Sequence, residues 1–261
     1  MKSGFVFIYL LKGVLGIRTI VISDLHGCYD EFNALLHKVK YQPEQDQLIL
    51  LGDYVDRGPR SKEVVDQVMT LHRDHGVIVL KGNHDQLFLD AILKDEDARW
   101  IRNGARQTLA SYCDLSCSPE ELNQETYEQA KAFIKTHFSH HLEFLTSLPL
   151  YYENATHLFV HAGINPFYAD FKEQPEDDFI WIREMFHDQA TNLDKIVVFG
   201  HTPTVHLHER ADIWFQKDKI GIDGACAYGK QLNALEIRED GSYHAHSIPA
   251  GTVAVSSKTT T

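Results

Sequence analysis

The fold of this chain is decided by one stretch, Gly52-Asp53-Tyr54-Val55-Asp56-Arg57-Gly58. It follows directly on residues 47–51, an apolar run with the pattern of a buried strand. In open α/β sheets, ligand crevices lie at the carboxyl ends of the strands. A turn there that holds two carboxylates, a guanidinium group and two glycines predicts a functional site, although alone it also fits an acidic loop with an internal Asp–Arg pair.

Polar side chains also follow the strand-like runs on either side of this stretch. Residues 19–23 are rich in β-branched side chains and lead into Asp24 and His26, which point the same way on an extended backbone. Residues 77–80 lead into Gly82-Asn83-His84-Asp85. Three successive strands therefore end in residues that can bind a metal ion or transfer a proton.

Helices are predicted between these strands. Residues 29–39 have an amphipathic pattern, and a second helix begins near Ser61 and ends at Gly76. Strands that alternate with helices indicate a parallel sheet with right-handed crossovers. The three strand ends are then expected at one edge of one sheet.

Two later strands each deliver a histidine. Residues 157–160 lead into His161-Ala162-Gly163, and residues 195–199 lead into Gly200-His201-Thr202. Short runs separated by turn residues follow and predict an antiparallel meander. These runs are 204–207, 213–215, 219–222, 234–237 and 243–248.

The middle of the chain, residues 90–148, has a helical pattern and is expected to form an insert that lines one wall of the crevice. It carries three histidines at helical spacing but no carboxylate partner for them, so a solvated or half-buried face is favoured over a metal site. Surface or hydrogen-bonded roles are favoured likewise for four later histidines. These seven residues are His137, His140, His141, His206, His208, His244 and His246.

Composition excludes some classes of function. A net charge of −12 over 261 residues argues against nucleic acid and against an anionic membrane surface as partners. The four cysteines form no paired framework and indicate structural thiols in a reducing compartment, so a cytoplasmic protein is predicted. Cys113 and Cys117 have metal-ligand spacing, but no second pair accompanies them.

The N-terminal segment, residues 1–18, has a basic residue and a short apolar core, as a signal peptide does. Lys12 interrupts that core, and no small-residue cleavage site follows it. An N-terminal extension is therefore favoured over an export signal.

The motifs together resemble those of PPP-type, calcineurin-like metallophosphatases. The chain is most similar to bacterial and phage-type serine/threonine protein phosphatases and to the related dinucleoside tetraphosphatases. The resemblance covers residues 19–237 in the order of the family, with Asp85 where many members have Glu. It implies an α/β fold, a metallophosphatase-like β-sandwich of mixed sheets flanked by helices. The domain is expected over residues 19–250, with the helical insert at about 90–148 and a C-terminal tail at 251–261.

The resemblance also implies a centre of two divalent metal ions. Asp24 and His26 would bind the first ion, Asp53 would bridge both, and Asn83, His161 and His201 would complete the second. Imidazole, carboxylate and amide ligands suit Mn²⁺, which is preferred here, and also Fe or Zn. Two cations about 3.5 to 4 Å apart activate a water and clamp the phosphoryl oxygens.

In the family pattern His84 is the general acid and Asp56 orients it. The alternative, that His84 is itself a metal ligand, would leave Asp56 without a task. Arg57 is expected to bind two phosphate oxygens with its planar fork. Arg183 is expected to be a second phosphate ligand, although it could instead pair with a neighbouring carboxylate, Glu184 or Asp178.

The function that the resemblance implies is hydrolysis of phosphomonoesters by in-line attack of a metal-bridging hydroxide. The preferred substrate is a phosphoserine or phosphothreonine protein, and the wider class includes phosphorylated small molecules. The alternative is a bis(5'-nucleosyl)-tetraphosphatase, which Arg99, Arg102 and Arg106 in the insert keep open. A metal-binding scaffold without activity would need a missing ligand or acid, and none is missing.

Overall fold

The structure, a computed structural model, describes residues 18–113 and 123–252. Several sequence predictions lie outside the described residues. These are the predicted extension up to residue 17, the tail from residue 253 onwards, and Cys117.

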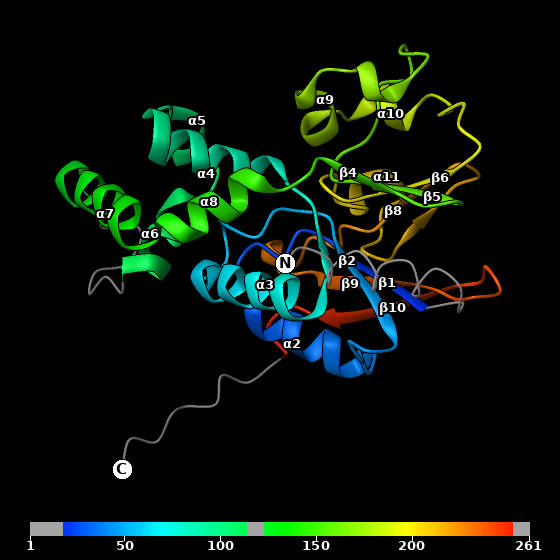
Figure 1. The fold of residues 1–261 in the computed structure, drawn as a ribbon, viewed down its shortest axis with the longest axis horizontal. Coiled ribbons are helices and arrows are strands. Elements are labelled where there is room, and N and C mark those ends of the chain that lie inside the picture. The colour runs from blue at the N-terminus through cyan, green and yellow to red at the C-terminus, as the bar shows by residue number, and fades with distance from the viewer. Residues whose placement is uncertain (1–17, 114–122, 253–261) are drawn as a thin grey trace, which may run out of the picture.

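Two mixed five-stranded sheets stack on each other, as the sequence predicted (Figure 1). The strand order is β10-β9-β1-β2-β3 in the first sheet and β4-β5-β6-β8-β7 in the second. The first sheet contains β1 (Arg18–Ile22), β2 (Asp46–Leu50), β3 (Ile78–Val79), β9 (Gln231–Ile237) and β10 (Tyr243–Pro249). The second contains β4 (Tyr151–Glu153), β5 (His157–Val160), β6 (Ile196–Phe199), β7 (Trp214–Phe215) and β8 (Lys219–Gly221).

The first three strands are parallel neighbours, and helices connect them. Helix α2 (Tyr29–Lys38) joins β1 to β2, and α3 (Ser61–His75) joins β2 to β3. Helix α3 ends where Gly76 adopts a left-handed conformation with φ 65°. The predicted parallel pairing with helical connections is confirmed, and the segments that follow the three strands lie at one edge of the sheet.

Strands β1 and β2 of the first sheet are largely buried on both faces, which explains their apolar sequence. Ile20 and Ile22 pack with Phe32 of α2 in the core beneath the helices. Val21, between them, points the other way and packs with Val198 of β6 in the core between the sheets. Because successive side chains point to opposite faces of β1, this strand contributes to both cores.

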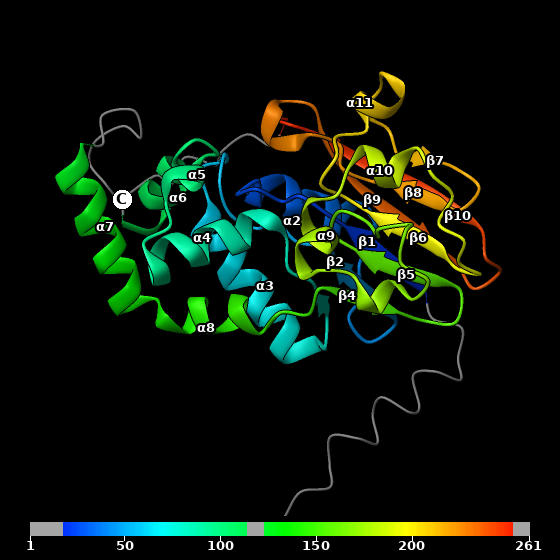
Figure 2. The same ribbon diagram turned by 90° about the horizontal axis from the view of Figure 1, so that it is seen from above.

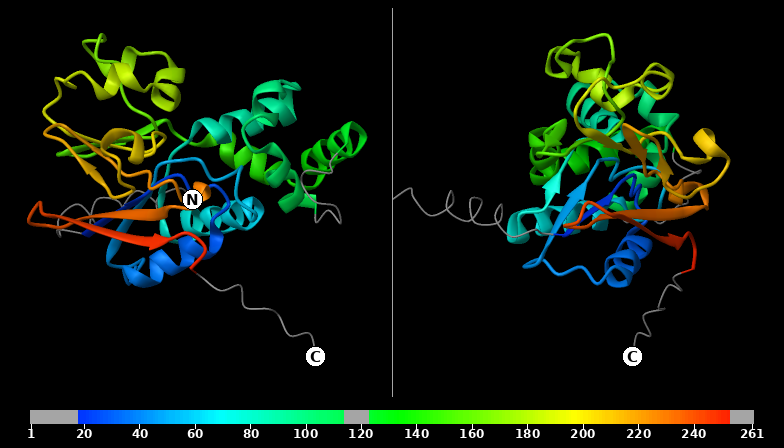
Figure 3. Two further views of the ribbon diagram at one scale, coloured as in Figure 1. Left: turned by 180° about the vertical axis from the view of Figure 1, so that it is seen from behind. Right: turned by 90° about the vertical axis from the view of Figure 1, so that its right-hand side faces the viewer.

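A third apolar core covers the outer face of the second sheet. It lies under the short helices η2 (Phe171–Glu173), α9 (Glu176–Trp181) and α10 (Glu184–His187). Phe179 and Phe186 of these helices pack against Val160 and Phe199 of the sheet. The molecule is therefore layered as helix, sheet, sheet and helix, which the views in Figure 3 show from behind and from the side.

The predicted antiparallel meander is confirmed only in part: β7 pairs with β8 and β9 pairs with β10 in antiparallel, but these runs form no continuous meander. Residues 204–207 do not form a strand, because the carbonyl of Thr204 accepts the amide hydrogens of Leu207 and His208 and closes the turn of α11 (Val205–His208). The remaining strands divide between the sheets. Strand β8 pairs with β6 in parallel and with β7 in antiparallel, whereas β9 pairs with β1 and β10. Strand β8 is buried at every residue, so it belongs inside the second sheet rather than at a hairpin edge.

Helices of the insert gather at one end of the sandwich, as Figures 1 and 2 show. They are α4 (Asn83–Lys94), α5 (Ala98–Ile101), α6 (Ala105–Cys113), α7 (Gln124–His137) and α8 (Ser139–Ser147). Phe88, Trp100 and Tyr112 join the insert to the core beneath α2 and α3. The insert therefore belongs to the same packed body as the sheets.

One insert histidine differs from its prediction. His137 and His140 are exposed, but His141 is fully buried. Its ring bonds to the Tyr112 hydroxyl at 2.9 Å and to the Asp66 carboxylate of α3 at 3.0 Å. The carboxylate partner comes from an element remote in sequence, and the contact fastens the insert to α3.

Candidate metal centre

The segments that follow β1, β2, β5 and β6 meet where the two sheets adjoin. The amides of Asp24 and His26 donate to the carbonyls of Gly52 and Asp53 at 3.1 and 2.8 Å. The amide of Gly200 donates to the carbonyl of His161 at 2.8 Å. These bonds join the predicted motifs into one cluster.

The backbone is strained at several predicted site residues. A left-handed conformation is unfavourable for residues other than glycine and tends to be kept at functional sites. The residues with positive φ include Asp24, His26, Asp53, Asp56, Arg57 and His201. Such a concentration at one place supports a functional centre there.

Glycines allow the carboxylates to approach the neighbouring loops. A Cβ atom on Gly82 would lie 2.2 Å from Oδ1 of Asp53, and one on Gly200 would lie 2.2 Å from Oδ2 of Asp24. No real Cβ fits at such distances, so any larger residue would displace these carboxylates. The motif glycines are therefore required by the packing of the acids.

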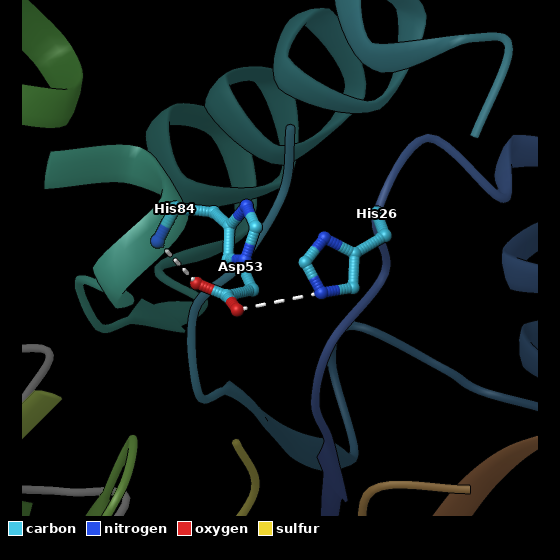
Figure 4. Close-up of side chains that lie close together, drawn as sticks. All are labelled: His26, Asp53 and His84. Carbon is cyan, nitrogen blue, oxygen red and sulfur yellow. Dashed lines mark hydrogen bonds and ion pairs between the residues drawn. The ribbon is translucent and has the colours of Figure 1, made fainter. Parts of the chain in front are cut away.

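Asp53 lies at the middle of the cluster, between two sets of histidines. His26, Asp53 and His84 place ligand atoms within 4.8 Å of one another, and so do Asp53, His161 and His201. Figure 4 shows the first set. Oδ2 of Asp53 lies 3.4 Å from Nε2 of His26, and Oδ1 lies 3.4 Å from Nε2 of His161. The two carboxylate oxygens thus face two sides, as those of a bridging ligand do.

Hydrogen bonds fix which nitrogen each imidazole presents. Nδ1 of His26 donates to the carbonyl of Val55 at 2.8 Å, and Nδ1 of His161 donates to the carbonyl of Leu51 at 2.9 Å. A carbonyl only accepts, so in both rings Nε2 is left to face Asp53. This is the arrangement by which proteins orient metal-binding histidines.

His201 carries the clearest sign that the cluster fits a cation. Its Nε2 atom is buried and has no hydrogen-bond partner among the described residues. A buried polar atom of this kind is costly unless a partner satisfies it. With nitrogen, carboxylate and amide donors around it and no thiolate, the site suits a divalent ion such as Mn²⁺, Fe or Zn.

Asp24 and Asn83 complete the predicted ligand set. The Asp24 carboxylate accepts the amide of His201 at 3.0 Å, and Oδ1 of Asn83 lies 2.9 Å from Nε2 of His161. The structure therefore brings all six predicted ligand residues together: Asp24, His26, Asp53, Asn83, His161 and His201.

The charge states suit cation binding. Burial, with help from Arg57, holds the pKa of His26 well below its usual range, and burial together with His161 does the same for His201. Burial opposes the charge on Asp53, but His161 and His84 outweigh it and keep the Asp53 pKa well below its usual range. The cluster thus offers two neutral imidazoles, His26 and His201, beside a charged carboxylate, whereas Asp53 outweighs burial and raises the pKa of His161 to about 9. A cation that binds His161 must therefore displace a proton.

Asp56 and His84 form a second unit beside Asp53. Nδ1 of His84 lies 2.7 Å from Oδ2 of Asp56, which is fully buried. The other Asp56 oxygen accepts the indole hydrogen of Trp100 at 2.8 Å and the hydroxyl of Thr108 at 2.7 Å. Nε2 of His84 faces the cluster.

Trp100 and Thr108 are residues that the sequence analysis missed. They lie on α5 and α6 of the insert, 44 and 52 positions beyond Asp56. No local pattern signals a contact over that distance. The insert was expected to line the crevice, and the structure shows that it holds the carboxylate that is hydrogen-bonded to His84.

The sequence analysis also missed the structural role of Asp85. Its carboxylate accepts three amide hydrogens, from Gly82 at 2.9 Å, Asp53 at 2.9 Å and Tyr54 at 3.0 Å. Burial and the charge on Asp53 raise the pKa of Asp85 to about 7. Asp85 therefore holds the loop that carries Asp53 against the start of α4.

Both predicted phosphate-binding arginines reach the cluster. Arg57 donates to Nε2 of His26 and to Nε2 of His84, the latter at 2.7 Å. Arg183 donates to the hydroxyl of Thr202, beside His201, at 3.1 Å. Within the described residues it forms no ion pair with the carboxylates that the sequence offered as alternatives, Glu184 and Asp178.

Two aromatic rings flank the cluster, and each lies against an arginine. Cζ of Arg57 lies 4.9 Å from the ring centre of Tyr228, which is 59% exposed. Cζ of Arg99, from the insert, lies 3.4 Å from the ring centre of Trp181. The Trp181 ring also contacts His201, with 5.9 Å between ring centres. The sequence offered no reason to single out Tyr228.

A comparison with known protein families shows to which family this chain belongs. The model of the calcineurin-like phosphoesterases matches residues 17–230, a span that includes every predicted site residue. The chain belongs to the calcineurin-like phosphoesterase family. The predicted resemblance is thereby confirmed.

The relatives of this chain within the calcineurin-like phosphoesterases include proteins named as dinucleoside tetraphosphatases and proteins named as protein phosphatases. The chain is 27% identical over 243 residues to the bis(5'-nucleosyl)-tetraphosphatase PrpE (asymmetrical) of Anoxybacillus flavithermus, covering 84% of this chain and 90% of the relative. It is 26% identical over 223 residues to serine/threonine-protein phosphatase 1 of Salmonella typhimurium, covering 84% and 91%.

Solved structures confirm the fold. A putative diadenosine tetraphosphatase superposes with a TM-score of 0.62 at 22% identity, covering 92% of this chain and 96% of the other. As predicted, the protein is a metal-dependent phosphatase. The described ranges, 18–113 and 123–252, contain no helix with the length and apolar character that crossing a membrane requires.

Proposed function

We propose that the protein hydrolyses phosphoric esters at a centre of two divalent cations that share the Asp53 carboxylate. The observation that carries this proposal is the position of Asp53, whose oxygens face His26 on one side and His161 on the other. When bound there, two cations would lower the pKa of a water and neutralise charge on the phosphoryl oxygens. Mn²⁺ is the preferred ion by its match to the donor set.

In this proposal Arg57 and Arg183 bind the phosphoryl oxygens. Arg57 donates to two imidazole nitrogens in the structure, and a phosphate is a stronger acceptor for a guanidinium group than imidazole is. When phosphate takes the hydrogen bonds of Arg57, Nε2 of His84 is released. Substrate binding and the freeing of His84 are therefore coupled.

Once phosphate has freed it, Nε2 of His84 takes up a proton from solvent. His84 then acts as the general acid and gives this proton to the leaving oxygen. Asp56 stabilises the protonated imidazole through Nδ1, and Trp100 and Thr108 hold Asp56 in place. Proton donation matters because an alkoxide is a poor leaving group, and a positioned acid accelerates such steps by about 10²- to 10⁴-fold. His84 also lies within reach of the ligand cluster, so its role needs a direct test.

For the substrate, phosphoserine and phosphothreonine proteins stay the prediction from sequence. Dinucleoside tetraphosphates are a second candidate, which Tyr228 favours. An exposed aromatic ring beside a phosphate-binding arginine offers a stacking surface for a nucleobase, and a phosphopeptide has no need of one. The tetraphosphatase relatives support the same candidate.

The test compares kcat/KM for a phosphoserine peptide and for diadenosine tetraphosphate, both with Mn²⁺ and with His84→Asn as the blank. If nucleotides are the substrates, Tyr228→Ala lowers kcat/KM for the dinucleotide by about 10-fold or more and leaves the peptide rate unchanged. Phe133→Ala is the matched control, since Phe133 is an exposed ring on α7 of the insert. An equal effect of Tyr228→Ala on both substrates would contradict the nucleotide candidate.

A further inference from the structure

We propose that Cys28, Cys226 and Glu31 form a separate site for a thiophilic divalent cation such as Zn²⁺. The two sulfur atoms and the carboxylate of Glu31 lie within 4.8 Å of one another. None of the three belongs to the phosphatase machinery described above. The site therefore adds an ion that the reaction itself does not require.

Two separate parts of the chain bring these ligands together. Cys28 precedes α2, Glu31 lies in the first turn of that helix, and Cys226 begins the short helix η3 (Cys226–Tyr228). Both thiols are buried, with exposed fractions of 7% and 4%, whereas Glu31 is half-buried. The sulfur atoms thus lie inside the molecule, and an ion can enter from the side of the carboxylate.

The spacing suits a tetrahedral ion. Zn–S bonds are about 2.3 Å, so two sulfur ligands in a tetrahedral site lie about 3.8 Å apart. The Cys28 thiol makes a long contact, 3.8 Å, with the carbonyl of His26 and also interacts with the Cys226 thiol. The ligand atoms lie within 4.8 Å of one another, which is compatible with this spacing.

Glu31 is already oriented for this role. One of its carboxylate oxygens accepts the amide hydrogen of Gly251 at 2.9 Å. Its other oxygen has no partner in the part of the chain that the structure describes. Two thiolates, one carboxylate and a water would give the four ligands of a zinc site.

The donors at the two sites differ in a way that separates their ions. Thiolates select soft ions such as Zn²⁺, whereas the nitrogen and oxygen donors around Asp53 accept Mn²⁺. The neighbouring Cys28 thiol and burial raise the pKa of Cys226, so an ion that binds there must displace a proton. One molecule can then hold different metals at the two places.

The site has a structural consequence. Cys28 lies two residues after His26, and Cys226 lies two residues before Tyr228. An ion bound by both cysteines would tie the segment after β1 to the segment that places Tyr228 against Arg57. It would hold the two walls of the phosphate site together without touching the substrate.

Cobalt provides the test, because thiolates bound to Co²⁺ give a near-ultraviolet charge-transfer band that nitrogen and oxygen ligands do not. The full chain, freed of metal with a chelator, is titrated with Co²⁺. We expect the band to reach the intensity of one thiolate-bound ion per chain and to disappear in Cys28→Ser and in Cys226→Ser. It should persist in Cys113→Ser, the matched control, whose half-buried thiol contacts Ala130 on α7.

Further variants separate this site from the phosphatase centre. Asp53→Asn should keep the charge-transfer band while it loses phosphatase activity, and Glu31→Gln should weaken the band while activity remains. No band in the wild-type protein, or a band that survives Cys28→Ser in a protein with wild-type circular dichroism, would overturn the proposal. A loss of two titratable thiols in the metal-free, denatured protein would also overturn it, because the pair would then be a disulfide.

Discussion

The two halves of the phosphatase site are held in different ways. In the acid half, His84 bonds to Asp56, and Asp56 bonds in turn to Trp100 and Thr108. In the ligand half, Asp53, His161 and His201 turn their donor atoms toward one another, and Nε2 of His201 has no partner among the described residues. The acid half is completed by the chain itself, whereas the ligand half is suited to completion by cations.

This difference separates two kinds of mutational effect. A change in the ligand half should alter both metal content and activity, because the donor atoms face the ions directly. A change in the acid half should alter the proton transfer and leave the metal content as it was. The predictions below test that division.

The largest effect is expected from Asp53→Asn. Both proposed ions share this carboxylate, and an amide oxygen without charge bridges cations poorly. The variant should therefore retain less Mn²⁺ after gel filtration and show phosphatase activity at the level of the buffer. Asp240→Asn, at an exposed turn, is the control and should match the wild type. Full activity with two bound ions in Asp53→Asn would refute a bridging role.

His84→Asn should lower kcat by about 10²- to 10⁴-fold and leave the metal content unchanged. The loss should be smaller for p-nitrophenyl phosphate, whose leaving group needs little protonation. The measurement compares the rates for the two leaving groups and includes metal analysis of the same preparation. If the variant loses an ion, His84 is a ligand, and the division between the halves is drawn in the wrong place.

Trp100→Phe should have a smaller effect, because it removes one hydrogen bond to Asp56 and keeps most of the ring packing. Loss of a partner that orients a catalytic group typically costs about 10- to 100-fold, so kcat should fall within that range while KM stays the same. Trp214→Phe, a half-buried tryptophan on β7, is the control. An unchanged kcat would show that the insert does not position the acid.

The smallest effect concerns the anchoring of the insert. Burial, opposed in part by Asp66, lowers the pKa of His141 to about 4, below the ordinary value of 6.5. The unfolded chain therefore takes up this proton first as the pH falls, and stability is lost between about pH 6.5 and 4. Tm should fall over this range, by about 2–4 °C for each kcal/mol. The fall should be shallower in His141→Gln, and an identical slope would exclude His141 as a cause.

Much of the site could be predicted because its residues stand at strand ends. Asp24, Asp53 and His161 each follow an apolar run, and parallel strands bring their ends to one edge. Local sequence carries that information. The alternation of strands and helices likewise predicted the parallel part of the first sheet, whereas the sandwich of two mixed sheets was implied by the resemblance to the metallophosphatases.

Contacts that the fold creates over long distances could not be predicted. Trp100 and Thr108 have ordinary helical surroundings in sequence, and only the packing of the insert brings them to Asp56. The division of β8 and β9 between two sheets was missed because both runs are short and apolar. Neighbours in a sheet are chosen by tertiary packing, which such runs do not encode.

The central claim is that one carboxylate, Asp53, holds two cations, and electron paramagnetic resonance of the Mn²⁺-loaded protein tests it most directly. Two Mn²⁺ ions that share a bridging carboxylate couple magnetically and give a multiline spectrum. We predict this spectrum at two ions per chain, with its appearance parallel to the rise in activity. One ion per chain at full activity, or two ions with the spectrum of isolated Mn²⁺, would contradict the claim.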